Sequence, residues 1–114
     1  MQNSKDSLSH LTQEVNRLHA DICSALADPS RILILYLLAE RDYTVNELAT
    51  RLSSVQPSTS RHLKILREHG LVRANRQAQN VVYSLNDPRI IDALDILRSV
   101  LRDTLAQRAS LISE

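Results

Sequence analysis

The stretch 54–85 constrains the fold of this chain more than any other. Its first half begins with small polar residues, continues with apolar residues at helical spacing, and stops at Gly70, the only glycine in the sequence. Glycine is the usual left-handed cap after the last turn of a helix. The second half holds two short runs of β-forming residues on either side of 77–79. The stretch therefore predicts a short helix followed directly by a β-hairpin, with strands at 72–76 and 80–85.

The turn of this hairpin lacks the glycine that tight hairpins usually contain. Its residues are Gln77, Ala78 and Gln79, and Asn80 follows them. Asparagine tolerates a positive φ better than most residues with side chains. We therefore expect Asn80 to help the chain reverse, and we expect the tip to be mobile.

Length and composition favour one mainly helical domain. The chain has 114 residues, of which 43% are apolar and 3% aromatic, with no Phe or Trp. A core of Leu, Ile, Val and Ala, in a chain with one glycine, favours helices over a β-sandwich. We predict one domain over residues 1–114, mainly α with a small β-hairpin.

Capping residues place two helix starts before the central stretch. Asp28-Pro29 provides a cap and a proline at the first helical position, and the apolar helix that follows should be central and buried. Thr44 and Glu47 match a capping box, which opens a short helix ending near Ser53. Only three or four residues separate that helix from the one beginning at Pro57, which is the spacing of a helix-turn-helix.

The second helix of this pair has one apolar and one polar face. Thr59, Leu63 and Leu66 recur at helical spacing and should face the core. Ser58, Arg61 and Lys64 should point outward. A helix with a polar face can enter the major groove of a duplex while a neighbouring hairpin contacts the backbone.

Two long amphipathic helices flank this core. One apolar stripe runs from Leu8 to Ile22, and another runs from Ile90 to Leu111, for more than six turns. So small a domain cannot bury the whole second stripe, so we expect a homodimer with a two-fold interface. For the first stripe, packing on its own domain is equally expected. The interface residues we assign are Leu8, Leu11, Val15, Leu18, Leu94, Leu97, Leu101 and Leu105.

Positive charge is concentrated in the middle of the chain. The formal net charge is only +1, but residues 51–89 hold seven cations and two anions, and the rest of the chain has a net charge of −4. This asymmetry is typical of a surface that faces phosphates. It predicts double-stranded DNA as a partner of the helix and the hairpin.

Cysteine usage and hydropathy indicate the compartment. Cys23 is the only cysteine, so no disulfide can form within the chain and a reducing compartment is expected. No apolar run approaches membrane-spanning length, and the amino terminus lacks the core of a signal peptide. We therefore expect a cytoplasmic protein without a membrane partner.

The predicted order is helix, helix, helix-turn-helix, two-stranded wing and helix. With this order and its sequence runs, the chain resembles the ArsR/SmtB family of dimeric winged-helix transcriptional repressors over residues 22–101. The runs are Ala-Leu-Ala-Asp-Pro-Ser-Arg-Ile at 25–32, Ser-Arg-His-Leu-Lys-Ile-Leu-Arg-Glu-His-Gly-Leu-Val at 60–72 and Val-Tyr-Ser-Leu at 82–85. The resemblance implies a homodimer that binds an imperfect inverted repeat near a promoter and dissociates when an effector arrives.

The resemblance also implies which residues face DNA. They are Gln56, Ser58, Ser60, Arg61, His62 and Lys64 in the helix, and Arg73, Arg76, Gln77, Gln79 and Asn80 in the wing. Residue chemistry agrees for most of them, because Arg61 can make a bidentate contact to guanine and Gln56 can read adenine. Arg61 and Lys64 could instead form an ordinary solvated face. His62, at the edge of the inward face, could equally be packed.

Both metal sites found in many members of this family lack their ligands here. The stretch that would read Glu-Leu-Cys-x-Cys is Glu-Leu-Ala-Thr-Arg at 47–51. The positions that match Asp-x-His and His-x-x-Glu on the last helix are Asp87, Arg89, Val100 and Asp103. Arginine and valine cannot replace imidazole as ligands. We therefore predict no metal and no cofactor, and an unknown effector that acts outside these sites.

Several interpretations of Cys23 stay open. It could be a small core residue, or a lone thiol that reacts with an oxidant or sulfur species or meets its twin across the dimer. With His19 it could supply two metal ligands per subunit, which alone make a poor site. His10 and His69 show no partner spacing, so we predict surface positions for both.

Two other classes of function compete with DNA binding. A winged-helix module that mediates only protein association would fit the near-neutral charge and the long apolar helix, but it has no reason to keep cations on the recognition helix. An enzyme is the least favoured class. The sequence shows no paired carboxylates in a plausible pocket, no nucleophile with a base and no glycine-rich phosphate loop.

Overall fold

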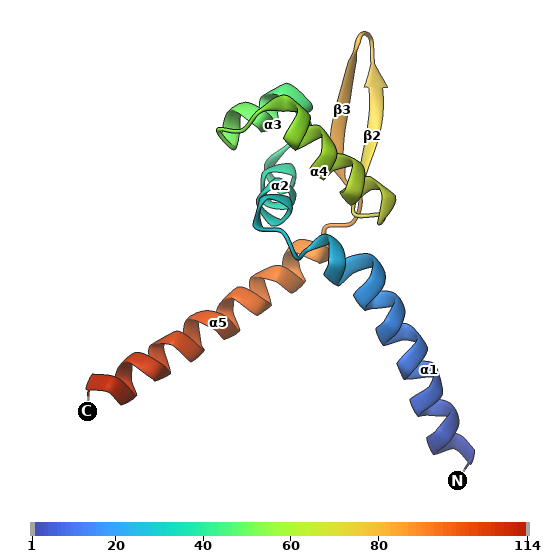
Figure 1. The fold of residues 1–114 in the computed structure, drawn as a ribbon, viewed down its shortest axis with the longest axis vertical. Helices are drawn as coiled ribbons and strands as arrows, with labels where there is room; N and C mark the ends of the chain where they lie inside the picture. The colour runs from blue at the N-terminus through green and yellow to red at the C-terminus, as the bar shows by residue number, and fades with distance from the viewer. Residues whose placement is uncertain (1, 114) are drawn as a thin grey trace.

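The computed structural model of this protein describes residues 2–113. Helices α2, α3 and α4 pack beside a small sheet, and the two terminal helices project from this body (Figure 1). The elements in chain order are α1 (Gln2–Leu18), a π-helical turn η1 (His19–Cys23), α2 (Pro29–Glu40), β1 (Tyr43–Thr44), α3 (Val45–Arg51), α4 (Gln56–Glu68), β2 (Val72–Gln77), β3 (Asn80–Leu85) and α5 (Arg89–Ser113). This arrangement confirms the predicted class, a mainly helical winged helix-turn-helix.

The predicted helix starts are confirmed by their hydrogen bonds. The Asp28 carboxylate accepts from the backbone N–H of Ser30 at 2.8 Å and begins α2. At the start of α3, the Glu47 N–H donates to the Thr44 hydroxyl at 3.2 Å, and the Thr44 N–H donates to the Glu47 carboxylate at 2.9 Å. These bonds satisfy N–H groups that have no partner within the helix.

The ends of α3 and α4 explain how the chain turns between them and into the wing. Ser53 has a φ of 52° and Gly70 a φ of 76°, and each follows the last turn of its helix. In both places the next N–H reaches back five residues, from Ser54 to Ala49 and from Leu71 to the Leu66 carbonyl, both at 2.9 Å. This is the Schellman arrangement, and Gly70 occupies the left-handed position that the sequence predicted.

The core forms where α2, α3 and α4 meet. Fully buried side chains come from all three helices and from β1, and the largest are Tyr43, Ile34, Leu35, Leu48, Leu63, Leu66 and Thr59. Those of α4 are the residues predicted to face inward. The prediction that α2 is central and buried is confirmed by Ile34, Leu35 and Leu38, which belong to the core. Leu33 is the exception, because its side chain is 53% exposed.

The sheet has three strands in the order β1-β3-β2, one more than the sequence predicted. Tyr43 pairs with Tyr83 and Thr44 with Val82, so the residues that lead into α3 are joined to the wing. In the hairpin, Gln77 belongs to β2, and the positive φ of 55° falls on Ala78. The expectation that Asn80 takes this conformation is therefore wrong, since Asn80 pairs with Gln77 as part of β3.

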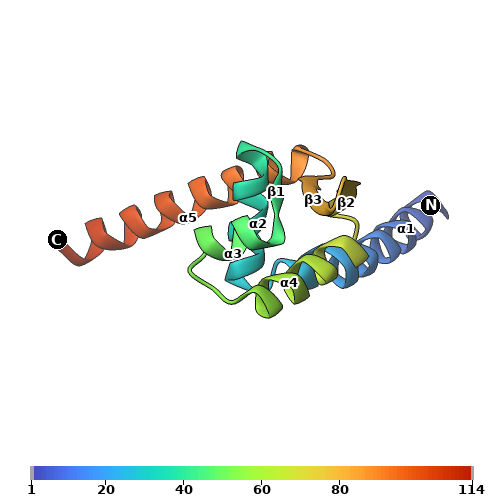
Figure 2. The same cartoon turned by 90° about the horizontal axis from the view of Figure 1, so that it is seen from above.

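Helices α1 and α5 leave the body on opposite sides (Figure 2). The radius of gyration of the Cα atoms is 18.1 Å, whereas a compact chain of this length would have about 13 Å. Of the stripe residues assigned to a dimer interface, Leu8, Leu11, Val15, Leu18, Leu97, Leu101 and Leu105 are exposed. Leu94 is the exception and corrects its assignment, because it is 6% exposed and packs in the core.

Candidate nucleic-acid interface

One face of α4 is a polar surface backed by the core. Thr59, Leu63 and Leu66 fix its opposite face, and this leaves Gln56, Ser60, Arg61 and Lys64 exposed. Ser58 is half-buried at the edge of the surface. Arg61 and Lys64 have no hydrogen bond or ion pair with the side chains described for residues 6–112, so their charges are available to a ligand.

The hairpin supplies a second polar surface near α4 (Figure 1). Its candidate contacts, Arg73, Arg76, Gln77, Gln79 and Asn80, are all exposed. The Arg73 Nε donates to the Ser84 hydroxyl at 3.1 Å, which ties this arginine to the neighbouring strand. The ribbon of the hairpin tip projects past α3 and α4 (Figure 1).

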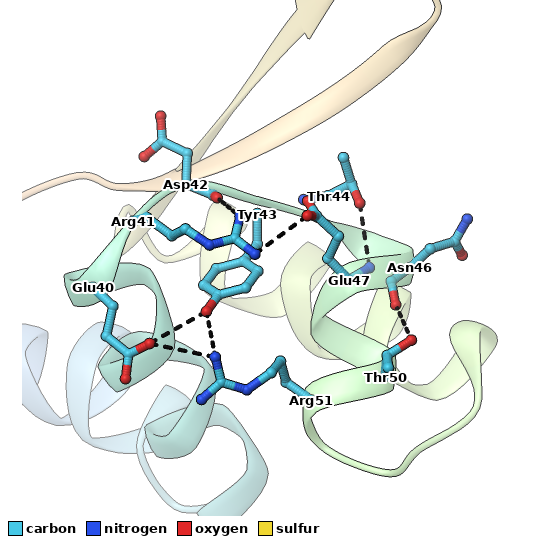
Figure 3. Close-up of polar contacts among 9 residues, drawn as sticks. All are labelled: Glu40, Arg41, Asp42, Tyr43, Thr44, Asn46, Glu47, Thr50 and Arg51. Carbon is cyan, nitrogen blue, oxygen red and sulfur yellow. Dashed lines mark hydrogen bonds and ion pairs between the residues drawn. The ribbon is translucent and has the colours of Figure 1, made fainter.

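A cluster around Tyr43 holds the first helix of the pair in place (Figure 3). The Arg41 guanidinium lies 3.8 Å from the centre of the Tyr43 ring, and Arg51 donates to the Tyr43 hydroxyl at 2.7 Å. The same hydroxyl donates to Glu40 at 3.3 Å. The cluster joins the end of α2, β1 and the end of α3. Arg51 contributes to the positive charge of the 51–89 segment, but its guanidinium is already bound to Tyr43 and Glu40.

His62 is the one candidate on α4 that turns toward its own domain. It is half-buried, and its Nδ1 lies 3.3 Å from the Nη1 of Arg31. Arg31 also lies 4.0 Å from the Asp28 carboxylate. The Ser30 N–H is the main cause of a lowered pKa at Asp28, and the charge of Arg31 lowers that pKa further.

Cys23 lies away from these surfaces, where η1 meets the start of α5. The thiol is exposed, so the interpretation as a core residue is wrong for this protomer. It borders a groove of about 650 Å³ whose mainly apolar lining includes Leu18, Ile22, Leu26 and Leu97.

His69 lines the same groove and is also a correction to the sequence analysis. It is half-buried rather than a surface residue, and its buried Nδ1 lies 3.4 Å from the Asp21 carboxylate without a hydrogen bond to any described residue. Arg17 is the main cause of the lowered pKa of Asp21, and His69 lowers that pKa further.

Residues 2–113 contain no group of three or more His, Cys, Asp or Glu side chains that could hold a metal ion. Within the same range, no helix is both long and apolar enough to span a membrane. His19 and Cys23 both lie on η1, and no third ligand joins them in the described structure.

An exposed basic helix in a helix-turn-helix, with a polar hairpin beside it, defines a winged-helix DNA-binding regulator. Residues 28–74 match the bacterial regulatory protein family named arsR. The uncharacterized HTH-type transcriptional regulator Rv0081 of Mycobacterium tuberculosis is 35% identical over 104 residues, which cover 90% of this chain and 91% of that protein. The chain belongs to the ArsR family of transcriptional regulators.

Solved structures of relatives share the fold. The crystal structure of Rv0081 matches with a TM-score of 0.75 at 36% identity, over 83% of this chain and 96% of that chain. The homodimeric winged helix-turn-helix domain Mb0332 of Mycobacterium bovis matches with a TM-score of 0.71 at 26% identity, over 90% of this chain and 91% of that chain. A further relative was found by sequence alone. It is the nodulation protein NolR of Rhizobium meliloti, which is 31% identical over 103 residues, covering 90% of this chain and 84% of NolR.

Proposed function

We propose that this regulator is a repressor that binds an inverted-repeat operator as a homodimer, with α4 in the major groove and the wing on the adjacent backbone. The observation that carries the proposal is the exposed face of α4, beside the polar wing. On this face Arg61 and Lys64 form no ion pair with any side chain that the structure describes. The contacts we assign are Gln56, Ser58, Ser60, Arg61 and Lys64 from α4, and Arg73, Arg76, Gln77, Gln79 and Asn80 from the wing.

The dimer in this proposal rests on the two projecting helices. Their exposed leucines form stripes that a single copy leaves in water, and burial of such surface is the main favourable term in association. The homodimeric state named for Mb0332 supports the same arrangement. Residues 1–114 would then form one winged domain with a dimerisation helix at each end.

The proposal is tested by comparing operator binding of the wild type and Arg61→Ala. A duplex enriched from a random library by the wild type serves as operator, and a scrambled duplex serves as the non-specific reference. Loss of one bidentate base contact should weaken operator binding by about 1–3 kcal/mol. Arg102→Ala removes the same charge from α5 and should leave binding unchanged.

Salt dependence separates this function from protein association alone. Operator binding should weaken steeply as salt rises, because each phosphate contact releases counterions. Equal binding by the wild type and Arg61→Ala would contradict the role of Arg61. A wild type that enriches no duplex, or binds with a flat salt dependence, would contradict DNA reading and favour the interaction module.

A thiol-responsive regulator is the second candidate, and the exposure of Cys23 favours it. A thiol outside the core can react with an oxidant or a sulfur species in the folded protein. Titration with a thiol reagent should modify Cys23 in native protein as readily as in unfolded protein. Modification only after unfolding would rule out this candidate.

We further propose that the protein is not an enzyme and acts in the cytoplasm. Its relatives are transcriptional regulators, and the DNA partner and a single reduced cysteine fit that compartment. The effector in this proposal acts outside the two metal sites whose ligands the sequence lacks.

A further inference from the structure

Arg31 connects the start of α2 and the residues just before it to α4, which is distant in the sequence. Its Nε donates to the Ala25 carbonyl at 2.6 Å, and its Nη2 donates to the Ser24 carbonyl at 3.3 Å. Its Nη1 lies 3.3 Å from the Nδ1 of His62 on α4. The arginine side chain is only 13% exposed. One guanidinium therefore links the connection between η1 and α2 to the middle of the recognition helix.

The chemistry of the pair fixes the roles of the two side chains. A guanidinium has donors only, so the Nδ1 of His62 must accept the hydrogen bond, and the ring proton of neutral His62 is then on Nε2. The planar fork of arginine holds several acceptors in one rigid geometry, which the flexible ammonium of lysine cannot reproduce. The three acceptors of Arg31 are thus held in a fixed relation to one another.

We infer that Arg31 is a positioning residue for DNA reading and that His62 serves as its acceptor rather than as a DNA contact. The inference rests on the proposed operator binding by α4. The buried face of α4 already limits its rotation about its axis, and through this link Arg31 restrains that rotation further. The rotation decides where Arg61 and Lys64 point.

The end of α4 lies near the same segment. The Nδ1 of His69, the residue that caps α4 at its C-terminus, is 3.4 Å from the Asp21 carboxylate of η1, but it makes no hydrogen bond among the described residues. The contact of Arg31 with His62 is therefore the hydrogen-bonded link between α4 and the segment that follows α1.

The test uses two substitutions of His62, each of which places a polar atom near the former position of a different ring nitrogen. In His62→Asn the amide oxygen lies near the former Nδ1 position and can still accept from Arg31. In His62→Gln the polar atoms lie near the former Nε2 position. The readout is the dissociation constant for the enriched operator and for the scrambled duplex, measured by fluorescence anisotropy, with thermal unfolding measured in parallel.

The inference expects His62→Asn to bind the operator within about twofold of wild type, and His62→Gln to bind about tenfold more weakly. Non-specific binding to the scrambled duplex should change much less, because it depends on phosphate contacts alone. The reverse order, with Gln retaining and Asn losing operator affinity, would show that Nε2 contacts DNA and would overturn the inference. Equal affinities for the two variants would overturn it as well.

Arg31→Lys provides an independent arm through a double-mutant cycle. The combined variant Arg31→Lys with His62→Gln should bind the operator no more weakly than Arg31→Lys alone, because both changes break one link. Additive losses would overturn the inference. If the wild type enriches no duplex, the proposed function fails and the inference falls with it. If the wild type binds its operator but the cycle is additive, only the inference fails.

Discussion

Leu101 on α5 offers the most direct test of how the projecting helices are used. Its side chain is 56% exposed and belongs to the stripe with Leu97 and Leu105. We predict that Leu101→Ala weakens the homodimer without altering the fold of the protomer, because Leu101 is not part of the buried core.

The magnitude follows from the exposed fraction. Full burial of a leucine side chain is worth about 1.5–3 kcal/mol, so the exposed half of Leu101 would contribute about 1 kcal/mol when a partner covers it. A two-fold interface contains the residue twice, so truncation should cost about 2 kcal/mol per dimer. The dissociation constant of the dimer should then rise by about thirtyfold.

Sedimentation equilibrium over a range of protein concentrations measures this constant. Ile96→Ala is the matched control, because Ile96 is 65% exposed on the same helix but lies on nearly the opposite face at 3.6 residues per turn. The control should dimerise like the wild type. Equal weakening by the two variants, or a monomeric wild type, would refute the assignment of the stripe.

Three further predictions concern local structure and can be checked by thermal unfolding. Gly70→Ala should cost about 1 kcal/mol, since an added Cβ would meet no atom within 4 Å and the only penalty is the φ of 76°. Ala78→Gly should raise the melting temperature or leave it unchanged, because glycine adopts the φ of 55° without strain. The Thr44 N–H is the main cause of a pKa of Glu47 below its usual 4.5. The advantage of the wild type over Glu47→Ala should therefore be complete above that value and diminish as the pH falls through the lower pKa of the folded state.

The sequence predicted the helices well because their signals are local. Asp28, Thr44 and Gly70 act on residues within one turn, and each does in the structure what the sequence indicated. Strand β1 has no such signal, because its pairing with β3 is a contact between residues distant in the sequence. The local signal at Thr44 indicates only a helix cap, for which an extended backbone is usual. The positive φ of Ala78 was missed for a similar reason, since the register of the two strands decides which residue turns.

The candidate site was predictable in its exposed residues but not in its links. Counting charge from the sequence gave Arg51 and Arg89 the same weight as Arg61, whereas the structure pairs Arg51 with Glu40 and Arg89 with Asp87. The contact between Arg31 and His62 spans 31 positions. No periodicity or motif in a single sequence indicates such a pair.

The pairing of β1 with β3 limits how this protein can change shape on DNA. The strand that leads into α3 is bonded to the wing, and the Tyr43 cluster attaches α3 to the end of α2. Wing and helix pair therefore form one stiff unit with few internal hinges. In a dimer, two such units must match half-sites about 34 Å apart, one turn of the duplex. Their spacing and mutual angle, rather than the shape of either unit, would then be the variable that distinguishes a bound dimer from a released one.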